Sequence, residues 1–373
     1  MTRPPRADTT ATDSADDARR LLVYQLTRIR GACVLGVILI HLTAPFPARV
    51  PFDWLTALML YLNSLTRFAV PIFVLVSGFY LSLNGRNERA GPFYRRTLKA
   101  LVIPYVVYSA GYAMISHRDA AGWLQAWLWA TLTGTAFYHL WFIPVILELY
   151  LLHPILRRWY RRSPLGGRFV LLAVAAQVTW AVATDVAIKP PAADSWLSLP
   201  AVGLSFLSYV GYFVMGYFLH DCASQVVNAA RRPAVIVASG LAWAATAAMI
   251  AAWRAIPLAD GQVFLSAAHP TLAISLLGPA LSLPAFVILA GWHQGARATG
   301  PTGWLVHTSG LYAYGVYYLH PLVYELVAWS FIHGAGLGKT SVMFLVIAFP
   351  AVCVLSVWLV KAAARLPFAR YLT

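Results

Sequence analysis

Apolar stretches of membrane-spanning length recur along the chain and are separated by short polar segments. A helix needs about 20 mostly apolar residues to cross the hydrocarbon core of a bilayer. Scanning the sequence at that length predicts ten spanning helices. They lie at 24–44, 67–84, 97–115, 138–156, 168–187, 200–220, 234–253, 271–292, 304–332 and 341–361. The pattern therefore predicts an all-α, polytopic membrane protein.

Two other apolar segments, 51–65 and 121–133, carry tryptophan but are too short to span a bilayer. We interpret them as interfacial or re-entrant helices on the outer side. The first 20 residues are small, polar and rich in aspartate, which predicts a disordered cytoplasmic tail. Residues 21–373 then form a single transmembrane domain.

The composition agrees with lipid as the main solvent of this chain. Of its 373 residues, 60% are hydrophobic and only 11% are charged, whereas about a quarter of a soluble domain is charged. Three cysteines lie far apart in or beside apolar runs. The sequence therefore predicts neither a disulfide framework nor a metal site.

The net charge of +15 would suggest a nucleic-acid partner in a soluble protein. Sorted by side, with the amino terminus placed in the cytoplasm, 22 of the 28 Lys and Arg residues fall on inner segments. Cytoplasmic loops of membrane proteins carry such an excess. The charge therefore predicts that both termini are cytoplasmic, and no nucleic-acid partner is needed to explain it.

Ionisable side chains within spanning segments are functional candidates because lipid makes them costly. Arg30 and His41 are eleven residues apart on the first predicted helix. That spacing is about three helical turns, so both share one face, with Arg30 about 16 Å nearer the cytoplasm. The alternative is an arginine that extends to the membrane surface and a histidine that hydrogen-bonds a neighbouring helix.

The fourth predicted span carries His139, Trp141 and Glu148. The first two lie at its outer end, where an aromatic belt is expected and where Trp141 alone needs no other explanation. Glu148 lies two turns deeper on nearly the same face as Trp141. A carboxylate at that depth must be protonated or paired with a cation.

Two more groups of polar side chains stand out. Tyr317, His320 and Tyr324 follow at i, i+3 and i+7 in the ninth span, a stripe that suits either helix packing or a proton relay. Arg96 and Lys99, at the start of the third span, share a face that can hold a phosphate. Ordinary inner-side charge explains this pair as well.

Five segments in order carry a resemblance to a known family: Arg30-x10-His41, PIFVLVSGFYL, FYRRTLKALVIPY, YHLWFIPVILELYLLHP and GVYYLHP. Together they resemble the membrane-bound acyltransferase family 3 along nearly the whole chain. Ten membrane helices with both ends inside also resemble that family. Two positions depart from its pattern. The family's Arg-x-x-Arg is here Arg96-x-x-Lys99, which keeps the charge but loses a bidentate fork, and a serine often found before the late histidine is Ala313.

The resemblance implies transfer of an acyl group, usually acetyl, from cytoplasmic acyl-CoA to a hydroxyl of a glycan or other cell-envelope molecule. Acyl-CoA is then a co-substrate, no bound cofactor is expected, and the protein resides in a bacterial inner or plasma membrane. Under that reading Arg30, Arg96 and Lys99 bind the donor phosphates. His41 is either a general base or a covalent acyl carrier.

The remaining candidates have supporting roles in the same hypothesis. We expect Glu148 to orient or charge-balance the site and Trp141 to stack on a sugar, while His139, Tyr317 and His320 are further substrate contacts. A proton-coupled transporter of a small molecule or envelope precursor is the competing class, because intramembrane His and Glu residues also form proton relays. No inverted repeat supports it. A membrane anchor or sensor leaves Arg30 and His41 unexplained.

Overall fold

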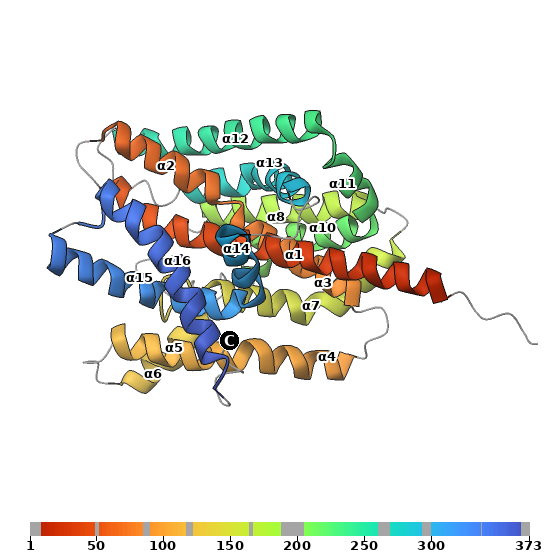
Figure 1. The fold of residues 1–373 in the computed structure, drawn as a ribbon, viewed down its shortest axis with the longest axis horizontal. Coiled ribbons are helices and arrows are strands. Elements are labelled where there is room, and N and C mark those ends of the chain that lie inside the picture. Colours follow the sequence, from red (N-terminus) through yellow and green to blue (C-terminus); the bar gives the residue numbers. More distant parts are fainter. Residues whose placement is uncertain are drawn as a thin grey trace, which may run out of the picture.

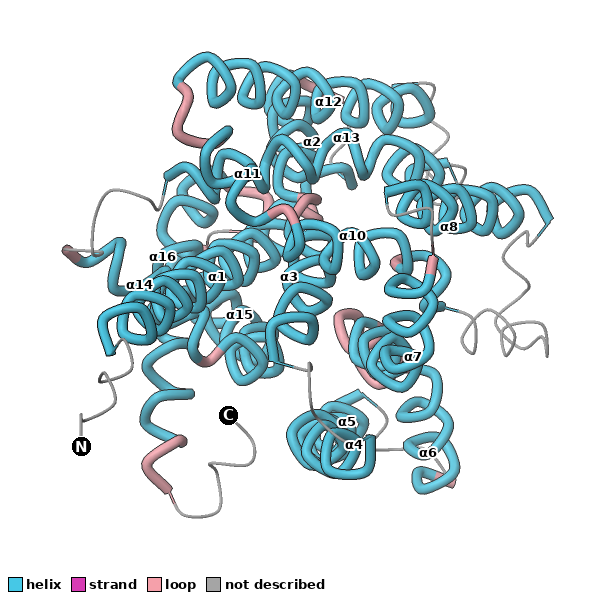
Figure 2. Tube along the Cα trace, turned by 90° about the vertical axis from the view of Figure 1, so that its right-hand side faces the viewer, coloured by secondary structure: helices cyan, strands magenta, loops and turns pink. Residues whose placement is uncertain are grey.

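The computed structural model describes residues 9–48, 52–84, 90–116, 122–163, 167–187, 205–259, 269–292, 300–336 and 338–366. Within these ranges every regular element is a helix, and most helices run roughly along the long axis of the molecule (Figure 1). Seen from the side, α1 (Thr9–Thr43) and α7 (Phe142–Arg162) lie nearly end-on (Figure 2).

The helices follow the order of the predicted spans, with several shorter pieces between them. Besides α1 and α7, the helices before residue 188 are α2 (Trp54–Thr66), α3 (Ala69–Asn84), α4 (Ala90–Thr97), α5 (Ile103–Ser116), α6 (Trp123–Thr133) and α8 (Gly167–Ala187). After it come α10 (Val210–Asp221), α11 (Ala223–Ala229), α12 (Pro233–Ala259), α13 (His269–Trp292), α14 (Pro301–Leu311), α15 (Ala313–Ala335) and α16 (Val342–Ala363). Short pieces are η1 (Phe46–Ala48), the π-helix η2 (Leu98–Val102) and η3 (Ser205–Ser208).

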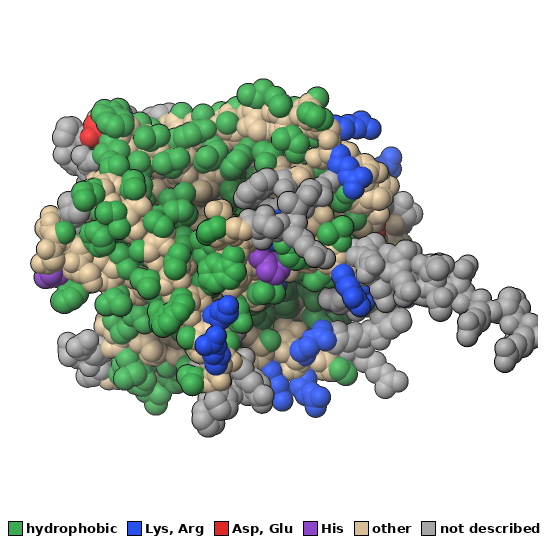
Figure 3. Space-filling model, in the orientation of Figure 1, with side chains coloured by type: hydrophobic (Ala, Val, Ile, Leu, Met, Phe, Trp, Pro, Cys, Tyr) green, Lys and Arg blue, Asp and Glu red, His purple; other side chains and the backbone are tan. Residues whose placement is uncertain are grey.

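Five of the described helical runs are long and apolar enough to cross a membrane: Arg19–Thr43, Trp54–Leu83, Gly91–Ser116, Pro233–Ala255 and Val342–Ala363. The predicted number of ten spans and the placement of both termini stay predictions. On the face shown in Figure 3, apolar side chains cover most of the surface, and Lys and Arg gather mainly toward the end where α1 begins. That distribution is the one expected of a membrane protein with a basic cytoplasmic end.

Several element boundaries differ from the predicted ones. The first helix begins at Thr9, within the segment predicted to be disordered, because a long helix already nucleated in the membrane extends at little cost through Ala- and Arg-containing sequence. Residues 1–8 lie outside the described residues, as do residues 200–204 of the sixth predicted span. The fourth span begins as a helix at Phe142 rather than at 138.

The ninth predicted span is two helices, because the chain turns at Tyr312 between α14 and α15. The preceding helix packs closely on α1 through a pair of glycines. A Cβ on Gly31 would lie 1.8 Å from the Val306 carbonyl oxygen, and one on Gly310 would lie 1.8 Å from the Thr27 carbonyl oxygen. Backbones can approach this closely only where side chains are absent.

A second close crossing joins α3 to α10. A Cβ on Gly78 would lie 2.1 Å from the Phe213 carbonyl oxygen, and one on Gly216 would lie 2.2 Å from the Leu75 carbonyl oxygen. Gly78 belongs to the PIFVLVSGFYL segment. Its neighbour Ser77 donates its hydroxyl proton to the Phe73 carbonyl of the same helix. This segment therefore sets the contact between two helices.

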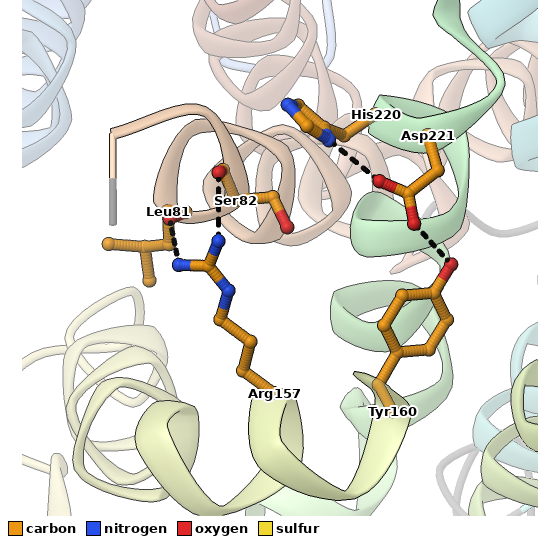
Figure 4. A network of polar contacts seen from close by, with 6 residues as sticks. All are labelled: Leu81, Ser82, Arg157, Tyr160, His220 and Asp221. Atoms are coloured by element: carbon orange, nitrogen blue, oxygen red, sulfur yellow. Dashed lines mark hydrogen bonds and ion pairs between the residues drawn. The ribbon is translucent and has the colours of Figure 1, made fainter. Parts of the chain in front are cut away.

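Polar contacts join α3, α7 and α10 near the C-terminal ends of all three helices (Figure 4). Arg157 of α7 donates to the carbonyl oxygens of Leu81 and Ser82, at 3.3 and 3.2 Å, in the last turn of α3. These oxygens have no partner within a helix that ends at residue 84. Beside them Tyr160 donates to Asp221, which also contacts His220.

Tyrosines join α5 to α15. The Tyr112 hydroxyl donates to the Tyr318 carbonyl at 2.6 Å, and the Tyr318 hydroxyl donates to the carbonyl of Leu101 in η2. Tyr108 and Tyr318 stack with ring centroids 4.7 Å apart. These contacts fix the part of α15 that carries Tyr317 and His320.

Candidate active site

Three histidines from separate parts of the sequence meet at one end of α1. The ring centroid of His41 lies 5.4 Å from that of His320 in α15, and His320 lies 5.5 Å from His139. His139 and His320 are 2% and 1% exposed, whereas His41 is half-buried. The structure thus brings together three of the predicted site residues, which we call the histidine cluster.

His139 differs from its prediction in both position and burial. The sequence places it on a helix at the outer interface, but it lies in the turn between α6 and α7 and is buried. Tyr317 donates its hydroxyl proton to the backbone carbonyl of His139. The bond holds the turn against α15, so Tyr317 positions His139.

Hydrogen bonding decides which nitrogen of His320 carries a proton. Its Nδ1 lies 2.8 Å from the Tyr317 carbonyl and 3.1 Å from the Val316 carbonyl. Because carbonyl oxygens only accept, Nδ1 is the protonated nitrogen and Nε2 keeps its lone pair when the ring is neutral. Nε2 can therefore accept a hydrogen bond beside the other two histidines.

Ring nitrogens in the cluster lack partners among the described residues. The buried Nε2 of His320 and both ring nitrogens of His139 form no hydrogen bond there. Buried polar atoms are satisfied in most native structures, so atoms without a partner indicate a place where water or a ligand binds. Within the described residues no group of His, Cys, Asp or Glu is arranged to hold a metal ion.

Tyr138 is a member of the site that the sequence did not single out. Its ring centroid lies 4.8 Å from that of His41, and it directly precedes His139 in the same turn. Helical spacing gave no signal for it, because a turn rather than a helix presents it to His41.

Arg30 lies further along α1 among aromatic rings. Its guanidinium is 5.3 Å from the ring centroid of Phe73, 5.8 Å from Tyr80 and 5.6 Å from Tyr314. These cation–π contacts hold the group in place. Among the described residues it has no hydrogen bond or ion pair, so its N–H donors are available to an anion.

The other predicted residues lie apart from this arrangement in different ways. Trp141 precedes the first residue of α7, is 40% exposed and stacks on Tyr209 at 5.9 Å. The Glu148 carboxylate accepts a hydrogen bond of 2.9 Å from the backbone N–H of Phe206 in η3. Arg96 and Lys99 are exposed, on α4 and on η2 respectively.

Arg67 is a further residue that the sequence analysis did not single out. It follows the last residue of α2 and is close enough to His41 and Tyr209 to act on both electrostatically. The sequence signal that could have singled it out is its predicted side of the membrane. It is one of the six Lys and Arg residues that the predicted topology leaves on the outer side, and the positive-inside rule does not account for these six.

Comparison with known proteins supports a transferase. A family model described as an acyltransferase domain matches residues 23–361, which is nearly the whole chain. Comparison with curated proteins and with solved structures finds no match. The matched range includes the five segments that carry the resemblance, and the chain therefore belongs to acyltransferase family 3, a family of membrane acyltransferases.

Proposed function

We propose that this protein transfers an acyl group, acetyl in the simplest case, from cytoplasmic acyl-CoA to a hydroxyl of a cell-envelope carbohydrate or related acceptor. The observation that carries the proposal is the geometry of α1. One end of this helix places His41 beside His320 and Tyr138. Arg30, about 16 Å away along the helix, has its guanidinium over three aromatic rings.

The donor binds along α1 in this proposal. Arg30, with the exposed Arg96 and Lys99, binds the phosphates of acyl-CoA through charge-assisted hydrogen bonds. The extended pantetheine arm then runs along the helix and brings the thioester to His41. This arrangement explains why a cation and an imidazole share one face of a membrane helix.

His41 supplies the reacting nitrogen. As a general base it removes the proton of the acceptor hydroxyl, and the hydroxyl oxygen attacks the thioester carbonyl carbon. A C–O bond forms, the C–S bond breaks, and the imidazolium returns its proton to the leaving thiolate. As an acyl carrier, His41 itself attacks the thioester, releases CoA, and then passes the acyl group to the acceptor.

The neighbours of His41 support either route. His320, with its protonated Nδ1 held by carbonyls, offers Nε2 to the proton that His41 handles. The rings of His139 and Tyr317 contact each other and lie beside His320. Trp141, stacked on Tyr209, provides an aromatic surface for a sugar ring. Glu148 holds η3, which leads into Tyr209.

The test is an assay of labelled acyl transfer. Purified protein is incubated with labelled acetyl-CoA and an envelope fraction, and label in the acceptor is counted. We expect His41→Ala to abolish transfer and His333→Ala to leave it unchanged. His333 is a matched control because it is an exposed histidine at the far end of α15. Retained transfer in the inserted His41→Ala protein contradicts the proposal.

Two further measurements separate the remaining mechanisms. Label bound to the protein itself without acceptor, released by hydroxylamine and lost in His41→Ala, identifies the acyl carrier route, and its absence identifies the general base. Vesicles containing the protein test the competing class. Flux of an intact solute with no covalent transfer identifies a proton-coupled transporter.

A further inference from the structure

Two arginines converge on a single neutral amide at the His41 end of α1. Arg67 donates to Asn63 Oδ1 from Nε and Nη2, at 3.2 and 3.1 Å. Arg254 of α12 donates to the same oxygen from Nη1 at 2.8 Å and also contacts Ser64 Oγ at 3.2 Å. Two nitrogens that share one acceptor lie within about 6 Å of each other. Two positive charges are therefore held side by side.

Nothing described in the structure neutralises this pair. Among the described residues neither guanidinium has a carboxylate partner, and their shared acceptor, Asn63, is uncharged. The charge of Arg67 acts directly on Arg254. Like charges at this separation repel, so such an arrangement is stable when an anion binds between or beside them.

The pair keeps donors free for such an anion. Each guanidinium has five N–H groups, and the bonds to Asn63 and Ser64 use only some of them. Both side chains are half-buried rather than fully buried, so part of each one remains exposed.

Asn63 links the arginine pair to the reacting histidine. Its Nδ2 donates to the Ile40 carbonyl and to Thr43 Oγ1, both at 2.9 Å. Ile40 directly precedes His41, and Arg67 acts on His41 electrostatically. An anion bound by the pair is thus held beside the acyl-transfer site, at the end of α1 away from Arg30.

We propose that Arg67 and Arg254 form a subsite for an oxyanion of the acceptor, so that the acceptor is an acidic molecule whose carboxylate or phosphate is bound next to the hydroxyl that receives the acyl group. The inference rests on the proposed function, because it assigns the acceptor side of that reaction. Arginine suits this role because its planar fork matches both carboxylate and phosphate. Trp141 stacks on Tyr209, and Tyr209 is close enough to Arg67 to interact with it electrostatically.

The test measures binding without acyl-CoA, so that no transfer takes place. Purified protein in phosphatidylcholine vesicles is titrated with a glucuronate trisaccharide or a glucose trisaccharide, and affinity is taken from the rise in unfolding temperature. We expect the glucuronate probe to bind at least about tenfold more tightly, and Arg67→Gln or Arg254→Gln to remove that preference. Arg67→Lys keeps charge but not the fork, so we expect an intermediate affinity.

Lys339→Gln is the matched control. Lys339 is also an outer cation, but its ammonium already contacts the Glu325 carboxylate at 2.8 Å, so its loss leaves the preference unchanged. Glucose 1-phosphate, titrated in parallel, distinguishes phosphate from carboxylate. If one Gln variant does not fold, the other Gln variant and Arg67→Lys still decide the result.

Three results overturn the inference. They are equal binding of the acidic and neutral trisaccharides, an undiminished preference in the Gln variants, or stabilisation by phosphatidylglycerol vesicles without any response to the soluble probes. The last assigns the pair to a lipid headgroup. A binding preference in a protein that shows no acyl transfer refutes the proposed function but keeps the anion subsite, so the two failures are distinguishable.

Discussion

Gly78→Ala tests the α3–α10 crossing and, through it, the position of the rings around Arg30. The added Cβ would lie 2.1 Å from the Phe213 carbonyl oxygen, whereas ordinary contact begins at 3.4 Å. The two backbones must therefore separate by about 1 Å, because neither helix backbone can yield locally. Phe73 and Tyr80 belong to α3, so the Arg30 surroundings move as well.

The magnitude follows from two opposing effects. Forcing an extra carbon into a packed contact costs about 1–3 kcal/mol or more. Replacing glycine by alanine within a helix gains up to about 1 kcal/mol. We expect a net loss of about 2 kcal/mol in the free energy of unfolding, with reduced acyl transfer.

Gly240→Ala in α12 is the matched control, because no atom lies within 4 Å of its added Cβ. The assay is the apparent unfolding temperature of each purified variant in one detergent, followed by tryptophan fluorescence. We expect it to fall by several degrees for Gly78→Ala and to stay level or rise for Gly240→Ala.

The partner glycine provides a further check. Gly216→Ala adds a Cβ 2.2 Å from the Leu75 carbonyl oxygen, so we expect a similar loss. The double variant loses less than both single variants combined, because the helices are already apart. Equal stability of Gly78→Ala and Gly240→Ala refutes the reasoning.

Three other substitutions test individual contacts. Glu148→Gln keeps an oxygen that accepts from Phe206 but removes the negative charge that we expect to orient or balance the site, so we expect near-normal stability with reduced transfer; normal transfer shows instead that the charge is not needed. Arg157→Gln removes the hydrogen bonds to the last carbonyl oxygens of α3, and we expect the unfolding temperature to fall by an amount equivalent to about 1.5–3 kcal/mol. No change in the unfolding temperature shows that water satisfies these carbonyl oxygens instead. Tyr317→Phe loses the hydrogen bond to the His139 carbonyl, which lowers the free energy of unfolding by about 1 kcal/mol. We expect slower transfer with an unchanged KM for the donor, whereas a raised KM shows that Tyr317 contacts the donor instead.

Part of the site follows from local periodicity. The eleven residues between Arg30 and His41 place both on one face of any α-helix, whatever surrounds it. The structure keeps both residues on α1. The same reasoning fails for His139, because helical spacing was applied to residues that form a turn. A turn before a helix has no hydrophobic period that would reveal it.

The glycines show a different limit. Hydropathy describes Gly31, Gly78 and Gly310 as unremarkable members of apolar segments. These glycines allow close helix packing only because of the helix that lies opposite each of them. The Val306 and Phe213 carbonyls that pack against Gly31 and Gly78 come from distant parts of the chain. A sequence pattern that records one helix at a time contains no information about that partner.

The sequence by itself determined that this is a helical membrane protein with Arg30 and His41 on one face, because lipid requires long apolar helices and the helix repeat is fixed. Its match to a known family, rather than either of these physical arguments, identified an acyltransferase. Only the tertiary structure decided that His139 and His320 approach His41, and that Arg67 and Arg254 share Asn63 beside it. The physical reason is that packing between helices is set by side-chain shape and hydrogen bonding across the bundle. Hydropathy along the chain does not encode which helices become neighbours.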